Sequence, residues 1–216
     1  MQQTTWRGSE VGHLVERAER LLHGEHRMVL GIAGAPASGK STLAELVLGA
    51  LDAAHPGKVV GVGMDAFHIG HRILEQRGQV GVKGAPHTFD VTGYVALLRR
   101  IRMEKEAIYA PEFHRDIEDS LAHTVQIGPE VRLVVTEGNY LLLPRDPWRH
   151  VRPLLDEGWF VFLDDEERQH RMLARHLSFG HSLADAERRT FGSDEVNARL
   201  VNAAQNFPDL WVTQLV

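Results

Sequence analysis

The stretch GAPASGKST, residues 34–42, decides the fold of this chain. Its spacing of glycines, followed by Lys40 and Ser41, is that of a phosphate-binding loop. The glycines let consecutive backbone N–H groups turn toward a phosphate, and the helix that follows adds the positive end of its dipole. Lys40 can then reach the outer phosphates, and Ser41 can ligate Mg²⁺ through its hydroxyl. The residues predicted to contact the nucleotide are Gly34, Ala35, Ala37, Ser38, Gly39, Lys40, Ser41 and Thr42.

The segments on either side of this loop have the patterns that the motif requires. RMVLGIAG, residues 27–34, is a nearly continuous apolar run, which is typical of a strand covered on both faces. A helical pattern follows at residues 40–51, and KVVGVGMD, residues 58–65, predicts a second buried strand. A chance glycine-rich turn is the alternative, but the strand and helix around the loop favour a right-handed crossover unit with a nucleotide site.

The rest of the chain continues this alternation. Helices are predicted at residues 9–24, 91–103, 166–177 and 182–206, and strands at AIYAP (107–111), VRLVVTEG (131–138), GWFVFLD (158–164) and DLWVTQLV (209–216). The pattern predicts an α/β protein with the three-layer fold of a P-loop NTPase, a mostly parallel sheet and helices on both faces. The long irregular stretch at residues 69–88 is a candidate functional loop.

The composition limits the remaining classes. A chain of 216 residues with 43% apolar content can bury one core, so residues 1–216 are expected to form a single domain. A net charge of −5 gives no general attraction for nucleic acid or anionic membranes. The absence of cysteine excludes disulfides and thiolate nucleophiles, and no apolar run is long enough to cross a membrane. We therefore expect a soluble, cytoplasmic protein with no nucleic-acid or membrane partner.

Two carboxylates are predicted at the edge of the sheet where the phosphate loop lies. Asp65 closes one predicted strand and Glu137 lies near the end of another, and the carboxyl ends of parallel strands share one edge. One acid there can accept the proton of an attacking hydroxyl while another holds Mg²⁺. We assign Asp65 and Lys40 as catalytic residues, and Glu137 with Ser41 as metal ligands. Capping of a turn is the alternative for each acid, and which one lies nearer the metal stays open.

Six segments resemble a known superfamily in their sequence and order: GIAGAPASGKST, MDAFH, KGAPHTFD, YAPEFHR, TEGNYLLL and DDEERQHRMLARH. The chain is similar, over residues 28–212, to the superfamily of uridine kinase, phosphoribulokinase and bacterial pantothenate kinase. It most resembles the branch described as putative fructose transport system kinases. The resemblance implies a kinase that moves the γ-phosphoryl group of Mg-ATP to a hydroxyl of a small molecule, with Asp65 activating the acceptor and Glu137 organising Mg²⁺. Similar kinases are often dimers, so a homodimer is a compatible assembly.

The resemblance also implies a helical lid at about residues 166–182, whose arginines bind the ATP phosphates. The matching positions are Arg168, Arg171 and Arg175, which share one helix face at spacings of three and seven. Planar guanidinium groups can clamp phosphate oxygens and spread the charge of the transition state. A solvated face paired with neighbouring acids is the alternative.

For the acceptor, the resemblance nominates His68, His87, Tyr109, His114 and Arg115, next to Asp65. Uridine kinases carry an acid before the proline of the related stretch, whereas residues 84–86 here read GAP, so a ribonucleoside acceptor is doubtful. Sugars, sugar derivatives, pantothenate-like acids and nucleosides stay open. Three basic residues in the long loop, Arg72, Arg77 and Lys83, suit an anionic acceptor, although solvated loop charges are the better explanation.

A nucleotide-regulated switch protein is the alternative function. DVTG, residues 90–93, resembles a GTPase switch motif, but the chain has no NKxD segment to bind guanine. Asp90 is better explained as the N-cap of the helix that follows it. A nucleic-acid motor would need basic tracks that the sequence lacks, and the histidines of HIGH and HGEH lack the spacing of a metal site.

Overall fold

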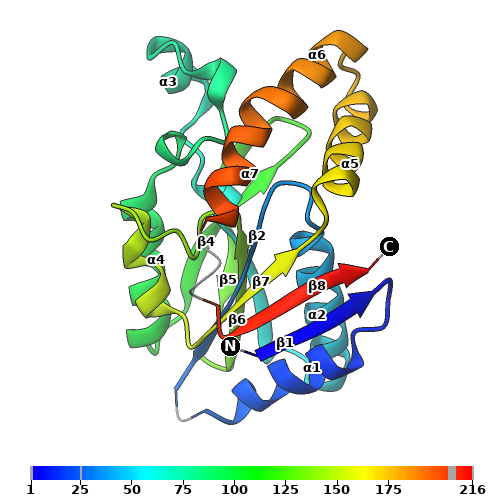
Figure 1. Cartoon of the computed structure of the whole chain (residues 1–216). Helices are drawn as coiled ribbons and strands as arrows, with labels where there is room; N and C mark the ends of the chain where they lie inside the picture. The colour runs from blue at the N-terminus through cyan, green and yellow to red at the C-terminus, as the bar shows by residue number, and fades with distance from the viewer. Residues whose placement is uncertain (1, 25, 204–207, 216) are drawn as a thin grey trace.

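The structure of the chain is a computed structural model that describes residues 2–24, 26–203 and 208–215 (Figure 1). The strands are β1 (Gln2–Arg7), β2 (Met28–Gly34), β3 (Val59–Gly63), β4 (Ile108–His114), β5 (Asp119–Ile127), β6 (Leu133–Gly138), β7 (Glu157–Phe162) and β8 (Leu210–Leu215). The helices are α1 (Gly12–Glu19), α2 (Lys40–Ala54), α3 (His71–Gln76), α4 (Val91–Met103), α5 (Asp165–Ser178), α6 (Leu183–Arg189) and α7 (Glu195–Asn202). Short 3₁₀ turns connect several of these elements, and a π-helix, Thr190–Asp194, joins α6 to α7.

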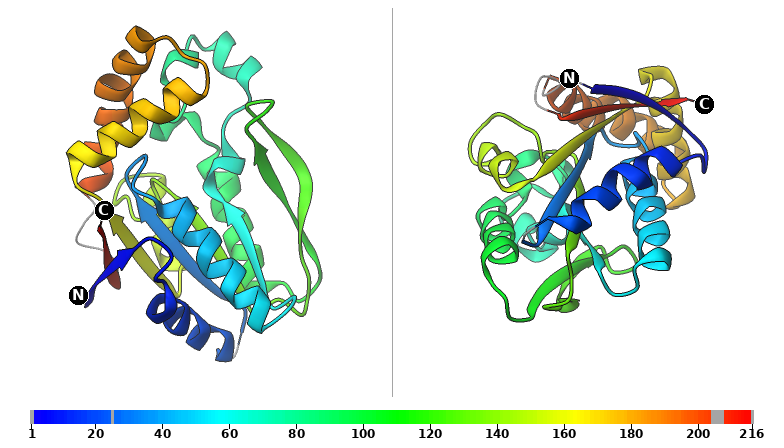
Figure 2. Two further views of the ribbon diagram at one scale, coloured as in Figure 1. Left: turned by 90° about the vertical axis from the view of Figure 1, so that its right-hand side faces the viewer. Right: turned by 90° about the horizontal axis from the view of Figure 1, so that it is seen from below.

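Six strands form the main sheet in the order β1-β8-β7-β2-β6-β3, and each of these pairings is parallel. Because parallel neighbours need crossover connections, helices lie on both faces of the sheet. Helices α1 and α2 pack on one face, and α4 with residues 140–155 packs on the other (Figure 2). The predicted three-layer α/β fold is confirmed.

Strand β2 shows why the sequence forms this sheet. Leu30 and Ile32 point into the core beneath α1 and α2, whereas Val29 and Ala33 point into the core beneath α4. Side chains alternate between the faces of a strand, so a strand covered on both faces must be apolar along its whole length. Fully burying each large aliphatic side chain stabilises the fold by about 1.5–3 kcal/mol. The predicted strand at residues 27–34 is thus confirmed.

The first and last strands lie side by side at one edge of the sheet. β1 pairs in parallel with β8, from Gln2 opposite Leu210 to Arg7 opposite Leu215. The sequence did not predict β1, because its residues are mostly exposed and lack an apolar alternation; Trp6 alone is buried in it. The strand exists because β8, at the other end of the chain, offers its edge.

Three further segments differ from the predicted elements. The strand predicted at residues 107–111 extends to His114 and turns back as β5, so β4 and β5 form an antiparallel hairpin outside the main sheet (Figure 2). The helix predicted at residues 9–24 is α1 followed by a 3₁₀ turn, Arg20–His23. The helix predicted at residues 182–206 is divided into α6, the π-helix and α7, and residues 204–206 lie outside the described part.

Helix α4 matches the prediction at both ends. The Asp90 carboxylate accepts a hydrogen bond from the Gly93 backbone N–H at 2.9 Å, which confirms Asp90 as the N-cap. None of the helices among the described residues has the length and apolar character needed to span a bilayer.

The carboxyl ends of β2, β3 and β6 lie together at the upper edge of the sheet in Figure 1. Helices α5, α6 and α7 stand above this edge on one side, and α3 stands above it on the other. Crevices at the carboxyl edge of such sheets are where ligands bind in α/β proteins. The candidate site is therefore sought between these helices and the sheet.

Candidate active site

The loop between β2 and α2 is a tight turn that needs small residues. Ala37 and Gly39 have φ angles of 64° and 89°, in the left-handed region that favours glycine. The alanine carries a conformational cost of about 1–2 kcal/mol there, a strain that is typical of functional loops. A Cβ atom at Gly34 would lie 2.7 Å from the Val161 carbonyl oxygen, so β7 leaves no room for a side chain. Turns of this kind point successive backbone N–H groups at an anion.

One polar atom of the loop has no partner inside the protein. The Ser38 hydroxyl is buried and makes no hydrogen bond within the described part of the chain. A buried polar group without a partner costs about 1–3 kcal/mol. A phosphate oxygen bound in the loop would satisfy it, so the loop fits the group that its sequence predicts.

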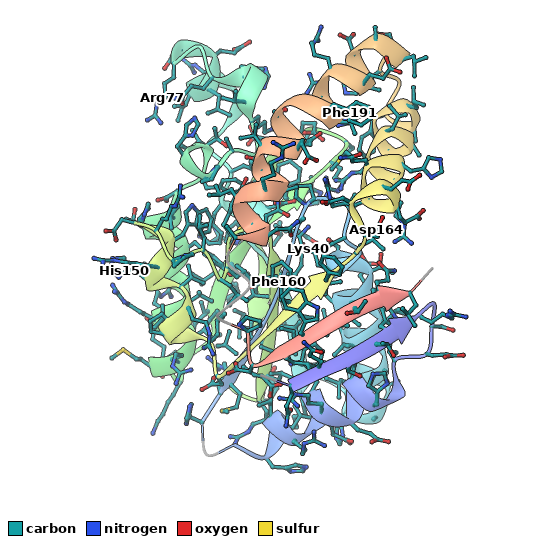
Figure 3. The ribbon with its side chains drawn as sticks, in the orientation of Figure 1. Lys40, Arg77, His150, Phe160, Asp164 and Phe191 are labelled. Atoms are coloured by element: carbon teal, nitrogen blue, oxygen red, sulfur yellow. The ribbon has the colours of Figure 1, made fainter. Side chains whose placement is uncertain are left out.

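Lys40, labelled in Figure 3, is buried at the start of α2. Burial lowers the pKa of Lys40, and the negative charges of Glu137 and Asp65 oppose that effect. Burial also raises the pKa of Glu137, while the charge of Lys40 lowers it, and the Ser41 hydroxyl donates a hydrogen bond to this carboxylate. The buried lysine and glutamate therefore offset each other's loss of hydration. The structure brings together the four residues predicted for catalysis and metal binding.

Asp65 lies beyond the end of β3, in the 3₁₀ turn Met64–Phe67, and not in the strand itself as predicted. The reason is that Gly138 at the end of β6 packs against Met64, where the chain leaves the sheet. This turn places the Asp65 carboxylate at the cavity, with Oδ2 3.5 Å from Nη2 of Arg115 on the hairpin. The arginine orients the carboxylate without enclosing it.

His68 lies one turn after Asp65, between two aromatic rings. Its ring centroid is 4.0 Å from that of Phe89 and 5.2 Å from that of Phe113. Nδ1 lies 2.8 Å from the Asp65 carbonyl oxygen, which can only accept, so Nδ1 donates and Nε2 of the neutral ring is left as an acceptor. Burial lowers the pKa of His68, against the opposing charge of Asp65, so the ring is held neutral.

A cavity of about 560 Å³ lies between the carboxyl edge, residues 68–89, the hairpin and helices α5–α7. Predicted site residues that line it are Lys40, Ser41, Asp65, His68, Arg115 and Arg175. A cleft of about 310 Å³ beneath the hairpin shares Ser41 and Asp65 with it and is also lined by Glu137. The two spaces meet at the residues predicted for phosphate transfer, as a donor and an acceptor site would.

The structure does not bring His87, Tyr109 or His114 to this cavity. His87 is exposed in the 3₁₀ turn Pro86–Thr88. Tyr109 is 51% exposed because the strand buries its neighbours Ile108 and Ala110 instead. His114 pairs with Glu112, its Nε2 lying 3.5 Å from Oε2. A β-bulge between Ala110 and Glu112 interrupts the alternation of side chains along β4. Phe113 and the predicted Arg115 therefore line the cavity, whereas Tyr109 and His114 do not.

Among the three predicted arginines of α5, only Arg175 lines the cavity. Arg168 is 1% exposed and pairs with Asp165 and with Glu195 on α7, at 3.0 and 2.5 Å. At the first turn of α5 this helix face packs against α7, and it reaches the cavity only two turns later. Helical spacing alone therefore overestimates how many arginines can bind the phosphates.

Arg171 contacts residues on the other side of the phosphate loop. It donates to Glu167 at 2.6 Å and to the Gln214 side chain at 3.0 Å. Gln214 lies beside Gly39, where a Cβ atom would meet its Oε1 at 2.5 Å. Arg171 therefore touches the loop through Gln214 and not through the cavity.

Several cavity residues were not nominated from the sequence. They include Phe113, Asn139, His176, Arg189, Asp194 and Asn197. Asn139 lies two positions after Glu137 in TEGNYLLL, one of the segments that resemble the superfamily, so the sequence could have indicated it as a site residue. No sequence pattern indicated Asp194 and Asn197, because the π-helix before α7 sets which way they face.

The chain matches no protein-family model. Over 215 residues it is 30% identical to a putative uridine kinase of Schizosaccharomyces pombe, which covers 96% of this chain and 92% of the relative. It is 28% identical over 138 residues to a pantothenate kinase of Enterococcus faecalis, which covers 63% of this chain and 45% of that protein. The crystal structure of a putative fructose transport system kinase from Silicibacter sp. TM1040 has a TM-score of 0.84 and 33% identity, covering 94% of this chain and 99% of that one. The first relative and this structure thus match nearly the whole chain.

Proposed function

Because the chain belongs to the superfamily of P-loop kinases that includes uridine and pantothenate kinases, we propose a role for each residue of its site in phosphate transfer. The protein is an ATP-dependent kinase of a small molecule. We propose that it transfers the γ-phosphoryl group of Mg-ATP to a hydroxyl, with residues 1–216 acting as one domain. The observation that carries the proposal is the cluster of Lys40, Glu137 and Asp65 at the end of the phosphate loop.

The triphosphate is bound by the loop and by Arg175. The loop offers its backbone N–H groups, the buried Ser38 hydroxyl and the Lys40 ammonium. Arg175 extends from α5 into the cavity and has no hydrogen-bond or ion-pair partner among the described residues. Burial lowers its pKa, and the charge of Arg115 lowers it further. Two cations that repel each other across a cavity favour an anion between them, and the γ-phosphate is such an anion.

Ser41 and Glu137 fit a magnesium ion that arrives with the nucleotide. Both offer hard oxygen atoms, which Mg²⁺ prefers, and the hydroxyl already donates to the carboxylate. The described residues contain no group of three or more ligating side chains, so phosphate oxygens and water would complete the coordination. When bound, the ion neutralises charge on the phosphates that Lys40 alone would not.

Asp65 acts as the base toward the acceptor. Its carboxylate takes the proton of the acceptor hydroxyl as the oxygen attacks the γ-phosphorus, and ADP leaves with the electrons of the broken bond. Arg115 holds this carboxylate from the hairpin side. Residues 166–182, on α5 and its turn, act as the lid that excludes water once the nucleotide is bound.

The test replaces Asp65 by Asn, which removes the base but keeps the shape of the side chain. An acceptor is first found by screening hydroxyl-bearing metabolites for stimulated ADP release with Mg-ATP. For Asp65→Asn we expect kcat to fall by about 10²–10⁴-fold, while ATP affinity, measured by calorimetry, changes by less than about threefold.

The matched control is Asp90→Asn, the same substitution at the N-cap of α4, which lies outside both cavities. We expect it to keep the wild-type rate. A folded Asp65→Asn protein that phosphorylates the acceptor as fast as Asp90→Asn would show that Asp65 is not the base.

A further inference from the structure

The cavity continues past Asp65 to a region that the phosphate groups do not use. The Phe113 ring lies 5.2 Å from the His68 ring and within reach of the Lys83 ammonium, and all three residues line the cavity. Lys83 therefore belongs to the acceptor end of the cavity. The residues that line this end decide which class of molecule is phosphorylated.

Lys83 is a partly buried cation whose ion pair is with an exposed carboxylate, that of Glu118. Its side chain is 15% exposed, and Nζ donates to the Glu118 carbonyl oxygen at 2.5 Å. The Glu118 carboxylate lies 3.7 Å away, beyond hydrogen-bond distance, and its side chain is 61% exposed to solvent. The Phe113 ring lies 5.3 Å from Nζ. An ammonium has three donors, so an acceptor molecule can still receive hydrogen bonds from it.

Arg189 brings a second cation to the cavity from the end of α6. It has no hydrogen-bond or ion-pair partner within the described ranges of the chain. Asp194, at the end of the π-helix that follows α6, is an acid that lines the same cavity. Its carboxylate is already bound by His176 Nε2 at 2.7 Å. The acceptor end is thus basic on both the loop side and the helical side.

Two carboxamides at this end have hydrogen-bonding capacity to spare. Asn139 Oδ1 is buried and has no hydrogen-bond partner in the described part of the protein. Asn197 is 6% exposed, and its Nδ2 lies a long 3.5 Å from the Gly84 carbonyl oxygen. Buried amide groups of this kind suit hydroxyl groups, which both donate and accept.

We propose that the acceptor is a compact polyhydroxylated anion, whose carboxylate or phosphate binds Lys83 and Arg189 while one of its hydroxyls lies at Asp65. This inference rests on the proposed function of the site. Further hydroxyls of the acceptor bind Asn139 and Asn197. The reaction forms one oxygen–phosphorus bond, releases ADP and leaves the anionic group unchanged. A neutral nucleoside has no anionic group for either cation, so this class separates the chain from relatives named for uridine.

The test compares each neutral polyol with its anionic counterparts. The probes are glycerol, glycerate and glycerol 3-phosphate; sorbitol and gluconate; and ribose and ribose 5-phosphate, with uridine as the neutral nucleoside. Calorimetry with magnesium and a non-hydrolysable ATP analogue measures binding, and ADP release with Mg-ATP measures turnover. We expect an anionic member of at least one set to bind at least tenfold more tightly than its neutral partner. The carboxylate and phosphate members show which anion the site takes.

Substitution of the two cations then locates the anionic group. For Lys83→Met and Arg189→Met we expect a loss of tenfold or more in affinity for the anion, with affinities for the neutral partner and for ATP within about twofold. Lys105→Met is the matched control, because Lys105 is exposed between α4 and β4. ATP binding shows that each variant is folded. If Lys83→Met does not fold, Arg189→Met alone provides the test.

Two results would overturn the inference. One is that no anion binds more tightly than its neutral counterpart, or that uridine binds best. The other is that Lys83→Met and Arg189→Met behave like Lys105→Met. Tight anion binding that depends on Lys83 but yields no phosphorylated product would support the acceptor class and contradict the chemistry assigned to Asp65. Failure of the acceptor class and failure of the proposed function are therefore distinguishable.

Discussion

Arg168 and Glu195 form a buried ion pair that fastens α5 to α7, with 2.5 Å between Nη2 and Oε2. The adjacent residue, Asp194, holds His176 of α5 at 2.7 Å. The two contacts join residues eight positions apart on α5 to two consecutive residues at the junction of the π-helix and α7. Arg168 belongs to this connection, which leaves Arg175 to face the cavity.

We expect Arg168→Met to destabilise the protein by about 1–3 kcal/mol, because the Glu195 carboxylate loses its buried partner and keeps only Gln169 and the exposed Arg199. Urea unfolding measures the change. Arg188→Met is the control, since Arg188 is 72% exposed and its pair with Asp185 contributes little. Equal stability of the two variants would contradict a structural role for Arg168.

Arg175→Met should weaken ATP binding by about tenfold or more, because it removes a charge-assisted contact to the phosphates. Its stability should change by less than about 1 kcal/mol, since the only hydrogen-bond, ion-pair or ring contact of the Arg175 side chain among the described residues is with the exposed Phe179 ring. Calorimetry with ATP and unfolding in urea measure the two effects. The comparison is Arg171→Met, which breaks the contact with Gln214 and leaves the cavity lining unchanged. If Arg171→Met weakened ATP binding and Arg175→Met did not, the nucleotide would lie on the Gln214 side.

Gly138→Ala should reduce both stability and kcat. An added Cβ would lie 2.7 Å from Sδ of Met64, and the backbone next to Met64 carries Asp65. Overpacking of this kind costs about 1–3 kcal/mol, and the displaced turn moves the proposed base. Gly49→Ala on α2 is the matched control, because its Cβ would meet nothing within 4 Å. In a helix that change stabilises by up to about 1 kcal/mol, so the two alanine variants should differ in sign.

His68 should make folding sensitive to acid. Burial lowers its pKa in the folded protein, so the unfolded chain binds more protons below the ordinary histidine pKa of about 6.5. Its contribution to stability is complete above that pH and is lost as the pH falls toward the folded pKa. His68→Gln should therefore lose less stability than the wild type between about pH 7 and pH 5, as urea unfolding at both pH values would measure. The same acid dependence in both proteins would show that His68 titrates normally.

The sequence alone determined the fold class and the edge of the sheet where the site lies. The glycine spacing of residues 34–41 requires one backbone shape, and the apolar runs at β2, β3, β6 and β7 require burial on two faces. These constraints are local, and the rule that parallel strands share a carboxyl edge places Asp65 and Glu137 near Lys40. That is why the cluster of Lys40, Asp65 and Glu137 could be predicted from the sequence.

Only the tertiary structure decided which residues of each periodic set face the cavity. Arg168 and Arg175 are equivalent by helical spacing, and the choice between them is made by Glu195, which lies 27 residues away from Arg168. The hairpin register turned Arg115 inward and Tyr109 outward, and β1 formed because β8 lies beside it. Periodicity records which face a side chain shares with its neighbours along the chain. What covers that face depends on contacts between distant segments, and these form only when the whole chain has folded.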